Sequence, residues 1–194
     1  LWEYTYGIDG VAALDPSNSD VRRDGRRYMN FFIIPGPLSE NYSIKDVQHG
    51  NVNVVWYDSP TLKLNRRMYV YTPAGYETSR QRYPVLYLLH GAGGDEDAWN
   101  NMGRASVIMD NLIAAGQAKP MLVVMTNGNA NQKMAPGYGP APPPPAAEGD
   151  STPGGGMRGS AFPESLVKDV IPYIENNYRV TKNKNNRAIA GLSM

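Results

Sequence analysis

Three short apolar segments constrain the fold of this 194-residue chain more than any other feature. They cover residues 85–89, 121–125 and 188–190. Continuous apolar runs of this length are typical of strands that are buried on both faces of a sheet. Helical patterns over residues 104–115 and 163–178 separate them. This alternation predicts an α/β fold with a mostly parallel sheet and right-handed crossovers.

The two helical patterns differ in their apolar spacing. The first is expected to place three apolar residues on one side: Val107, Ile108 and Leu112. The second has an apolar residue at every fourth position from Leu166 to Tyr178, as one face of a helix requires. Pro172 lies inside it, and we expect a kink there because proline lacks a backbone N–H.

Two more strand patterns precede the α/β alternation. Val52, Val54 and Trp56 alternate with polar residues, and residues 67–71 form a second apolar run. A polar turn around Ser59 joins the two, which predicts an antiparallel pair at the entry to the larger sheet.

The first 34 residues predict a separate β unit. Trp2, Tyr4 and Tyr6 alternate as in a half-buried strand, and Asp9-Gly10 is a hairpin turn signal. A Pro-Gly-Pro linker at 35–37 follows. We therefore expect two domains: residues 1–36 as the C-terminal part of a β-sandwich, and residues 37–194 as the N-terminal part of the α/β domain. Both ends then fall inside structural units, so we expect an internal fragment.

Composition excludes several classes of function. The net charge of +1 gives no electrostatic case for nucleic acid or an anionic membrane as a partner. The apolar stretches are too short for a transmembrane helix. Zero cysteines exclude disulfides, thiol nucleophiles and cysteine metal sites.

The third apolar segment runs into Gly191-Leu192-Ser193-Met194. A strand followed by Gly-x-Ser is the first part of a G-x-S-x-G nucleophile elbow, a sharp turn that lifts a serine hydroxyl into an active site. Gly191 supplies the small residue that this turn needs. The alternative is a serine that caps the next helix. The preceding strand and an upstream glycine loop favour Ser193 as the nucleophile of a serine hydrolase.

The glycine loop is His90-Gly91-Ala92-Gly93-Gly94, directly after the first apolar segment. In α/β-hydrolases this loop provides one of two backbone N–H groups that bind the oxyanion, and the residue after the nucleophile provides the other. We expect Ala92 to be the first donor, with Gly93 as its substitute, and Met194 to be the second. The alternative is a glycine-rich turn without a ligand.

A general base is harder to assign. His49 and His90 are the two histidines of the chain. His90 is expected to form structural hydrogen bonds in the glycine loop, and His49 to lie in a turn. Because the acid and the histidine follow the nucleophile in α/β-hydrolases, we expect both beyond Met194.

Aromatic residues are candidates for substrate binding. Trp99, Tyr138 and Phe162 could form a wall over the active site, although packing beneath the loop is the favoured role for Trp99. Tyr138 lies in a Pro- and Gly-rich stretch, residues 134–159, which predicts an ordered excursion or a mobile flap. Asp95, Glu96 and Asp97 are interpreted as structural residues that favour a helix dipole.

Several separated segments resemble one family. The segment 85–99 resembles the oxyanion segment of the feruloyl-esterase-type carbohydrate esterases, which are esterase D-like members of carbohydrate esterase family one. Three further segments resemble the strand before it, the helix before the elbow and the nucleophile strand: residues 67–76, 162–175 and 187–194. Residues 4–18 resemble the end of the E-set, immunoglobulin-like module found before many of these enzymes.

The resemblance implies a three-layer α/β-hydrolase fold, incomplete here, behind a partial β-sandwich. It implies a secreted, periplasmic or cell-surface bacterial enzyme that hydrolyses feruloyl or acetyl esters of xylan. The catalytic group would be a Ser-His-Asp/Glu triad, without metal or cofactor. A siderophore esterase and a non-catalytic carbohydrate-binding chain are the alternatives. Since the triad acid and histidine are absent, we expect these residues alone to be inactive and to need a C-terminal segment.

Overall fold

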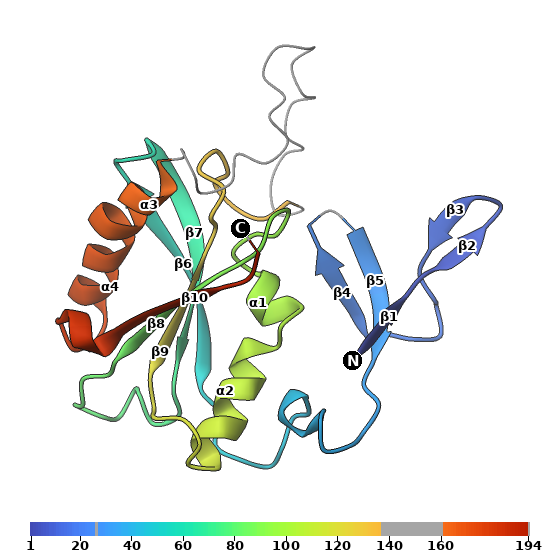
Figure 1. The fold of residues 1–194 in the computed structure, drawn as a ribbon, viewed down its shortest axis with the longest axis horizontal. Helices are drawn as coiled ribbons and strands as arrows, with labels where there is room; N and C mark the ends of the chain where they lie inside the picture. Colours follow the sequence, from blue (N-terminus) through green and yellow to red (C-terminus); the bar gives the residue numbers. More distant parts are fainter. Residues whose placement is uncertain (26, 137–160, 194) are drawn as a thin grey trace.

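A five-stranded mixed sheet forms the centre of the computed structural model, which describes residues 1–25, 27–136 and 161–193. The strand order is β10-β8-β9-β7-β6 (Figure 1). The strands are β6 (Asn51–Ser59), β7 (Leu64–Thr72), β8 (Val85–Leu89), β9 (Leu122–Thr126) and β10 (Arg187–Gly191). Strands β8, β9 and β10 are parallel, whereas β6 and β7 form an antiparallel pair that joins β9. This confirms the predicted α/β sheet and its antiparallel entry. The expected burial of the run 188–190 on both faces is wrong, because β10 is the edge strand of the described sheet and Ile189 is 63% exposed.

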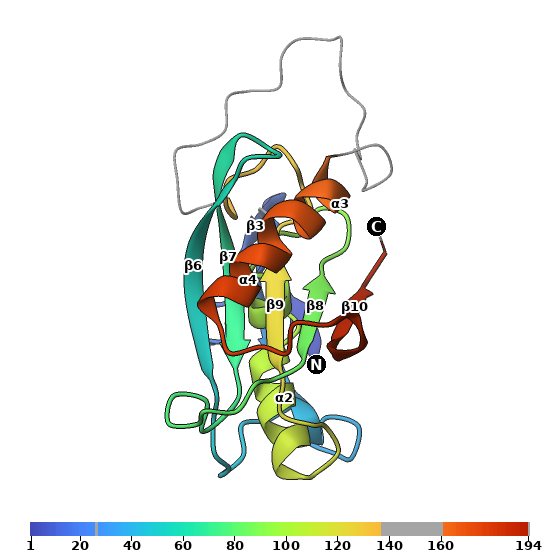
Figure 2. The same cartoon turned by 90° about the vertical axis from the view of Figure 1, so that its left-hand side faces the viewer.

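Helices cover both faces of this sheet (Figures 1 and 2). One face carries α1 (Ala98–Asn101) and α2 (Ala105–Ala114), and the other carries α3 (Phe162–Ser165) and α4 (Ile171–Asn177). Strand side chains alternate between two cores. Met68 and Val70 pack with Ile174 of α4, while Tyr69 and Tyr71 pack with Met109 of α2. The result is the three-layer architecture that the sequence predicts.

The predicted kink at Pro172 takes the form of a wider turn. A π-helical turn (Leu166–Val170) separates α3 from α4, and its end is marked by the Ile171 N–H, which donates to the Leu166 carbonyl. In a continuous α-helix the proline ring would clash with the carbonyl four residues earlier. The π turn widens the helix at that point, so the apolar face from Leu166 to Ile174 stays buried.

The face that α2 turns to the sheet differs from the apolar group noted in the sequence. Ala105 and Met109 are the buried apolar residues, whereas Val107, Ile108 and Leu112 are half-buried. Two polar residues explain the rotation. Asp110 accepts hydrogen bonds from the Tyr71 hydroxyl (2.7 Å), the Gly50 N–H (2.8 Å) and His49 Nδ1 (3.0 Å). Asn111 donates to the carbonyls of Asn41 and Ser43, next to a 3₁₀ turn (Glu40–Tyr42).

The N-terminal residues form two small antiparallel sheets. Strands β1 (Trp2–Tyr4), β5 (Arg27–Phe32) and β4 (Val21–Asp24) form one, and β2 (Tyr6–Ile8) and β3 (Val11–Ala13) form the other. Asp9 and Gly10 connect β2 to β3 with φ values of +49° and +81°, as the predicted hairpin turn requires. The β4 strand lies beside α1 (Figure 1). The domain boundary at residue 36 stays a prediction.

Within the described ranges, each helix is too short or too polar to cross a membrane. A last 3₁₀ turn (Lys184–Asn186) leads into β10. The excursion predicted over residues 134–159 lies almost wholly outside the described residues.

The core between α4 and the sheet gives a stability prediction. Ile174 is completely buried, so Ile174→Ala should lower the free energy of unfolding by about 2–5 kcal/mol through lost burial and a cavity. Val167, in the π-helical turn before α4, is 63% exposed and serves as the control. Val167→Ala should change the free energy of unfolding by about 0.5 kcal/mol or less. Urea denaturation measures both. Equal losses in the two variants would contradict this packing.

Candidate active site

The candidate site lies where the direction of the chain through the sheet reverses. From β8 the chain crosses through α2 to β9, and from β9 it returns over the opposite face to β10, on the other side of β8. Such a switch point leaves a crevice beyond the carboxyl ends of the two strands. The loop 90–94 follows β8 and Leu192-Ser193 follows β10, so the two motifs meet at this crevice.

Backbone contacts join these two motifs directly. The Ala92 N–H donates to the Ser193 carbonyl at 3.0 Å, and the Leu192 N–H donates to the Leu89 carbonyl at 3.3 Å. A β-carbon at Gly91 would lie 2.9 Å from the Leu192 carbonyl oxygen. Glycine is therefore required for this approach, between segments that are about a hundred positions apart in the sequence.

Ser193 has the strained, exposed position expected of an elbow serine. Its φ is +38°, in the left-handed region that residues with a β-carbon rarely adopt. A β-carbon at Gly191 would lie 3.1 Å from the Leu89 carbonyl oxygen, which explains the small residue there. An open cavity of about 320 Å³ is lined by Leu89, His90 and residues 189–193.

The structure describes two of the three predicted oxyanion donors, Ala92 and Gly93. Ala92 lies next to Ser193, but its N–H is bonded to the Ser193 carbonyl. Gly93, the substitute, has a φ of +83° at the tip of the loop. Met194 lies outside the described residues, and so does Tyr138.

His90 fixes the orientation of the Gly91–Ala92 peptide group. The Gly128 N–H donates to His90 Nε2 at 2.8 Å, so the ring proton is on Nδ1, which donates to the Gly91 carbonyl at 2.7 Å. The Gly94 N–H donates to the same carbonyl at 3.1 Å. Since C=O and N–H point in opposite directions across a trans peptide, these bonds direct the Ala92 N–H toward Ser193.

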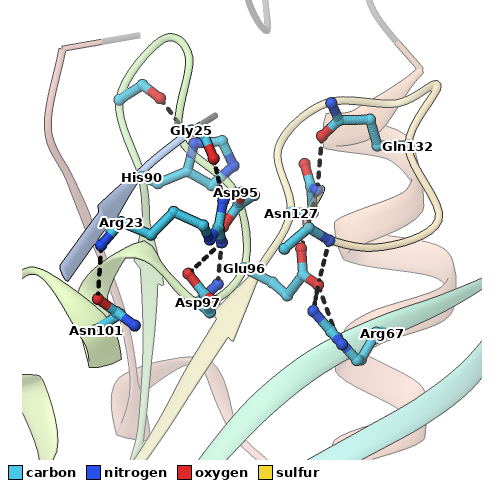
Figure 3. Close-up of polar contacts among 12 residues, drawn as sticks. Arg23, Gly25, Arg67, His90, Asp95, Glu96, Asp97, Asn101, Asn127 and Gln132 are labelled. Atoms are coloured by element: carbon cyan, nitrogen blue, oxygen red, sulfur yellow. Dashed lines mark hydrogen bonds and ion pairs between the residues drawn. The ribbon is translucent and has the colours of Figure 1, made fainter. Parts of the chain in front are cut away.

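Three consecutive carboxylates hold the far end of the loop. Asp95, Glu96 and Asp97 are each at most 3% exposed (Figure 3). Glu96 Oε1 accepts from Arg67 Nε at 2.8 Å and the Ala135 N–H at 2.7 Å, and its Oε2 accepts from Asn127 Nδ2 at 3.0 Å. The helix-dipole interpretation was therefore incomplete. These residues are structural, but ion pairs and hydrogen bonds across the fold define their role.

Asp95 and Asp97 pair with Arg23 of β4. Arg23 donates to both oxygens of Asp95 at 2.7 and 2.9 Å and to Asp97 Oδ1 at 2.6 Å. Burial by itself lowers the pKa of Arg23, but its bonds to the two carboxylates outweigh this and raise the pKa above its usual value. Burial raises the pKa of Asp97, and the charge on Asp95 adds to it, against the opposing effect of Arg23.

Other residues singled out in the sequence have structural places. The Trp99 indole N–H donates to the Leu89 carbonyl at 2.8 Å, and the ring packs against the core on the α2 side, as the packing alternative predicts. Phe162 is fully buried at the start of α3, so its expected place in an aromatic wall is wrong. His49 precedes β6, at the opposite end of the sheet from Ser193.

Sequence reasoning did not identify Arg23 and Arg67 as partners of the loop. One signal was available: three acidic residues directly after a buried strand and a glycine loop need cationic partners if the fold covers them. The sequence contains 19 lysines and arginines, so this signal could not say which of them are the partners.

Comparisons with known proteins agree on one family. The Esterase family model matches residues 59–194. The chain is 35% identical over 196 residues to the endo-1,4-beta-xylanase/feruloyl esterase of Xylanibacter ruminicola, an alignment that covers 98% of this chain and 25% of that protein.

Solved structures of ferulic acid esterases also resemble this chain. One ferulic acid esterase is 32% identical, with a TM-score of 0.58 over 77% of this chain and 51% of the other. The CE1 ferulic acid esterase AmCE1/Fae1A from Anaeromyces mucronatus is 26% identical, with a TM-score of 0.63 over 81% and 55%. The chain thus spans a quarter of the bacterial relative and about half of each solved structure.

The two hydrogen bonds of His90 give a second prediction. His90→Phe leaves the Gly128 N–H and the Gly91 carbonyl without this partner, and should destabilise the fold by about 1–3 kcal/mol. It should also speed amide hydrogen exchange in residues 90–94. His90→Gln keeps a donor and an acceptor, so it should lose less stability than His90→Phe. A Phe variant with unchanged stability and exchange would show that the ring does not hold this peptide.

Proposed function

Because the chain belongs to the esterase family, we propose that it supplies two parts of a serine esterase. These are the nucleophile and the glycine loop of residues 90–94, which we call the oxyanion loop. The proposed substrates are feruloyl or acetyl esters of plant cell-wall polysaccharide. One observation carries the proposal: the strained, exposed Ser193 lies against the Ala92 N–H at the switch point of the sheet. The names of the similar proteins, which include feruloyl esterase and xylanase, support the substrate class.

In the proposed acylation, the Ser193 hydroxyl attacks the ester carbonyl carbon. A bond forms between Oγ and that carbon, and negative charge develops on the carbonyl oxygen. The bond to the leaving alcohol then breaks, and the alcohol oxygen takes the proton that Ser193 gave up through a general base. Water repeats the attack on the acyl-serine, which releases the acid and restores Ser193.

Backbone amides would stabilise the developing charge. Ala92 and Met194 are the proposed donors, and each such donor contributes about 2.7–4 kcal/mol to transition-state stabilisation. In the structure the Ala92 N–H is bonded to the Ser193 carbonyl. For catalysis, the Ser193 carbonyl must turn away so that the oxygen of the substrate can replace it.

Neither histidine of this chain suits the role of general base. His90 is 4% exposed, and its Nε2 already accepts from the Gly128 N–H. His49 is bonded to Asp110 at the other end of the sheet. We therefore assign the base and its acid partner to residues of the whole protein outside this chain, which is consistent with the greater length of the solved relatives. A secreted or periplasmic location belongs to the same proposal.

The test uses the whole protein. The wild-type protein should release ferulate from methyl ferulate or acetate from acetylated xylan. Ser193→Ala should lower kcat by at least about 10³-fold, because the nucleophile is lost. A fluorophosphonate probe should label the peptide that contains Ser193. Liquid chromatography with mass spectrometry measures both products and the labelled peptide.

Ser19→Ala is the matched control, because Ser19 is exposed in the N-terminal region. It should retain full turnover and labelling. Wild-type protein that binds xylan but cleaves none of these esters would favour the non-catalytic alternative. Turnover that persists in Ser193→Ala would exclude this serine as the nucleophile.

A further inference from the structure

The contacts of Arg23 link the N-terminal sheet β1-β5-β4 to the proposed active site. Arg23 belongs to β4, yet its guanidinium is buried among side chains of residues 95–97 (Figure 3). Its own backbone N–H donates to Asn101 Oδ1 at 3.1 Å, just beyond these carboxylates. More than 70 residues separate these partners in the sequence.

The charges make this contact specific. Asp95 and Asp97 are adjacent buried carboxylates, and without a cation their mutual repulsion and desolvation would drive the loop toward water. Arg23 satisfies both at once, because its planar fork binds Asp95 through two parallel bonds and Asp97 through a third. A lysine in the same place has one charged centre and lacks this fork.

The same hairpin also contacts the tip of the loop. Gly25 follows β4 with a φ of +57°, and a β-carbon there would lie 2.8 Å from the Gly93 carbonyl oxygen. The Arg23 guanidinium donates to the Gly25 carbonyl as well. The arginine therefore fixes both the acidic end of the loop and the turn against which Gly93 packs.

Ala92 and Gly93 lie between two fixed ends of the loop. His90 holds the upstream end through Gly91 and Gly128, and Asp95 holds the downstream end through Arg23. With three glycines among residues 91–94, the loop backbone has little intrinsic preference for one conformation. Its geometry at Ala92 then depends on those two ends.

We propose that Arg23 is a positioning residue for the oxyanion loop. The β1-β5-β4 sheet, which carries Arg23, would then contribute to the geometry of the esterase site. This inference rests on the proposed function. Arg23 does not touch the substrate in this proposal, and it acts through Asp95, Asp97 and Gly25 on the direction of the Ala92 N–H.

The kinetic test compares Arg23→Ala with Arg27→Ala in the whole protein. Arg27 lies in the same hairpin, but its side chain is 79% exposed, and its ion pair with Asp24 is long, at 3.8 Å. Misplacing an oxyanion donor weakens an interaction made in the transition state. Arg23→Ala should therefore lower kcat on methyl ferulate about tenfold or more, with KM changed less than about twofold, while Arg27→Ala keeps both values.

A ligand pair separates positioning from general loss of structure. Phenylboronic acid forms a tetrahedral adduct on a serine hydroxyl, whereas ferulate binds as the product. Arg23→Ala should weaken the binding of phenylboronic acid by about the same factor as it lowers kcat, and should leave the Kd of ferulate nearly unchanged. Equal weakening of both ligands, or a fall in kcat that follows the folded fraction, would overturn the proposal.

Two further variants keep the test meaningful if Arg23→Ala folds poorly. Arg23→Lys should retain the fold and lose part of kcat. Adding Asp97→Asn to Arg23→Ala removes one of the two uncompensated charges and should recover stability and part of kcat. Full kcat in Arg23→Lys together with no recovery in the double variant would contradict positioning by this guanidinium.

Hydrogen exchange distinguishes failure of this inference from failure of the proposed function. Arg23→Ala, but not Arg27→Ala, should speed amide exchange in peptides covering residues 90–98, whether or not the protein cleaves an ester. Absence of ester cleavage by the wild type would reject the esterase assignment. Unchanged exchange in Arg23→Ala would reject the role of Arg23 in holding the loop.

Discussion

The need to neutralise three adjacent buried carboxylates governs how the glycine loop is held. Asp95, Glu96 and Asp97 are covered by the fold, and removal of one partner from a buried ion pair typically costs about 3–5 kcal/mol. Arg67 of β7 meets Glu96 from the central sheet, and Arg23 of β4 meets the other two from the N-terminal sheet. The loop is thus tied to two sheets at positions directly beyond the glycines.

This arrangement has a chemical purpose in the proposed esterase. An oxyanion donor is effective when its dipole is already directed before charge develops, because the donor itself then needs no reorganisation during the reaction. Glycines permit the close approach of Gly91 to the Leu192 carbonyl, but they do not hold a backbone in place. Rigidity comes from His90 on one side and from the acidic residues on the other.

Local patterns predicted much of the fold. The runs at 85–89, 121–125 and 188–190 correspond to β8, β9 and β10 within about one residue. Burial on both faces explains the apolar residues of β8 and β9. The run in β10 has a different setting, because this edge strand is exposed over most of its length. Contacts between residues far apart in the sequence caused the errors. Asp110 and Asn111 bind the segment before β6 and set the rotation of α2, and Phe162 enters the core where an exposed aromatic was expected.

The sequence by itself determined the strand and helix alternation, the glycines of the loop and the Gly-x-Ser turn, since each of these depends on side chains within a few positions of one another. Tertiary structure alone decided that the loop after β8 and the turn after β10 meet, and that Arg23 and Arg67 neutralise residues 95–97. The physical reason is range: periodicity and turn chemistry are local, whereas a buried ion pair is defined only when the folded chain brings distant residues together and excludes water from them.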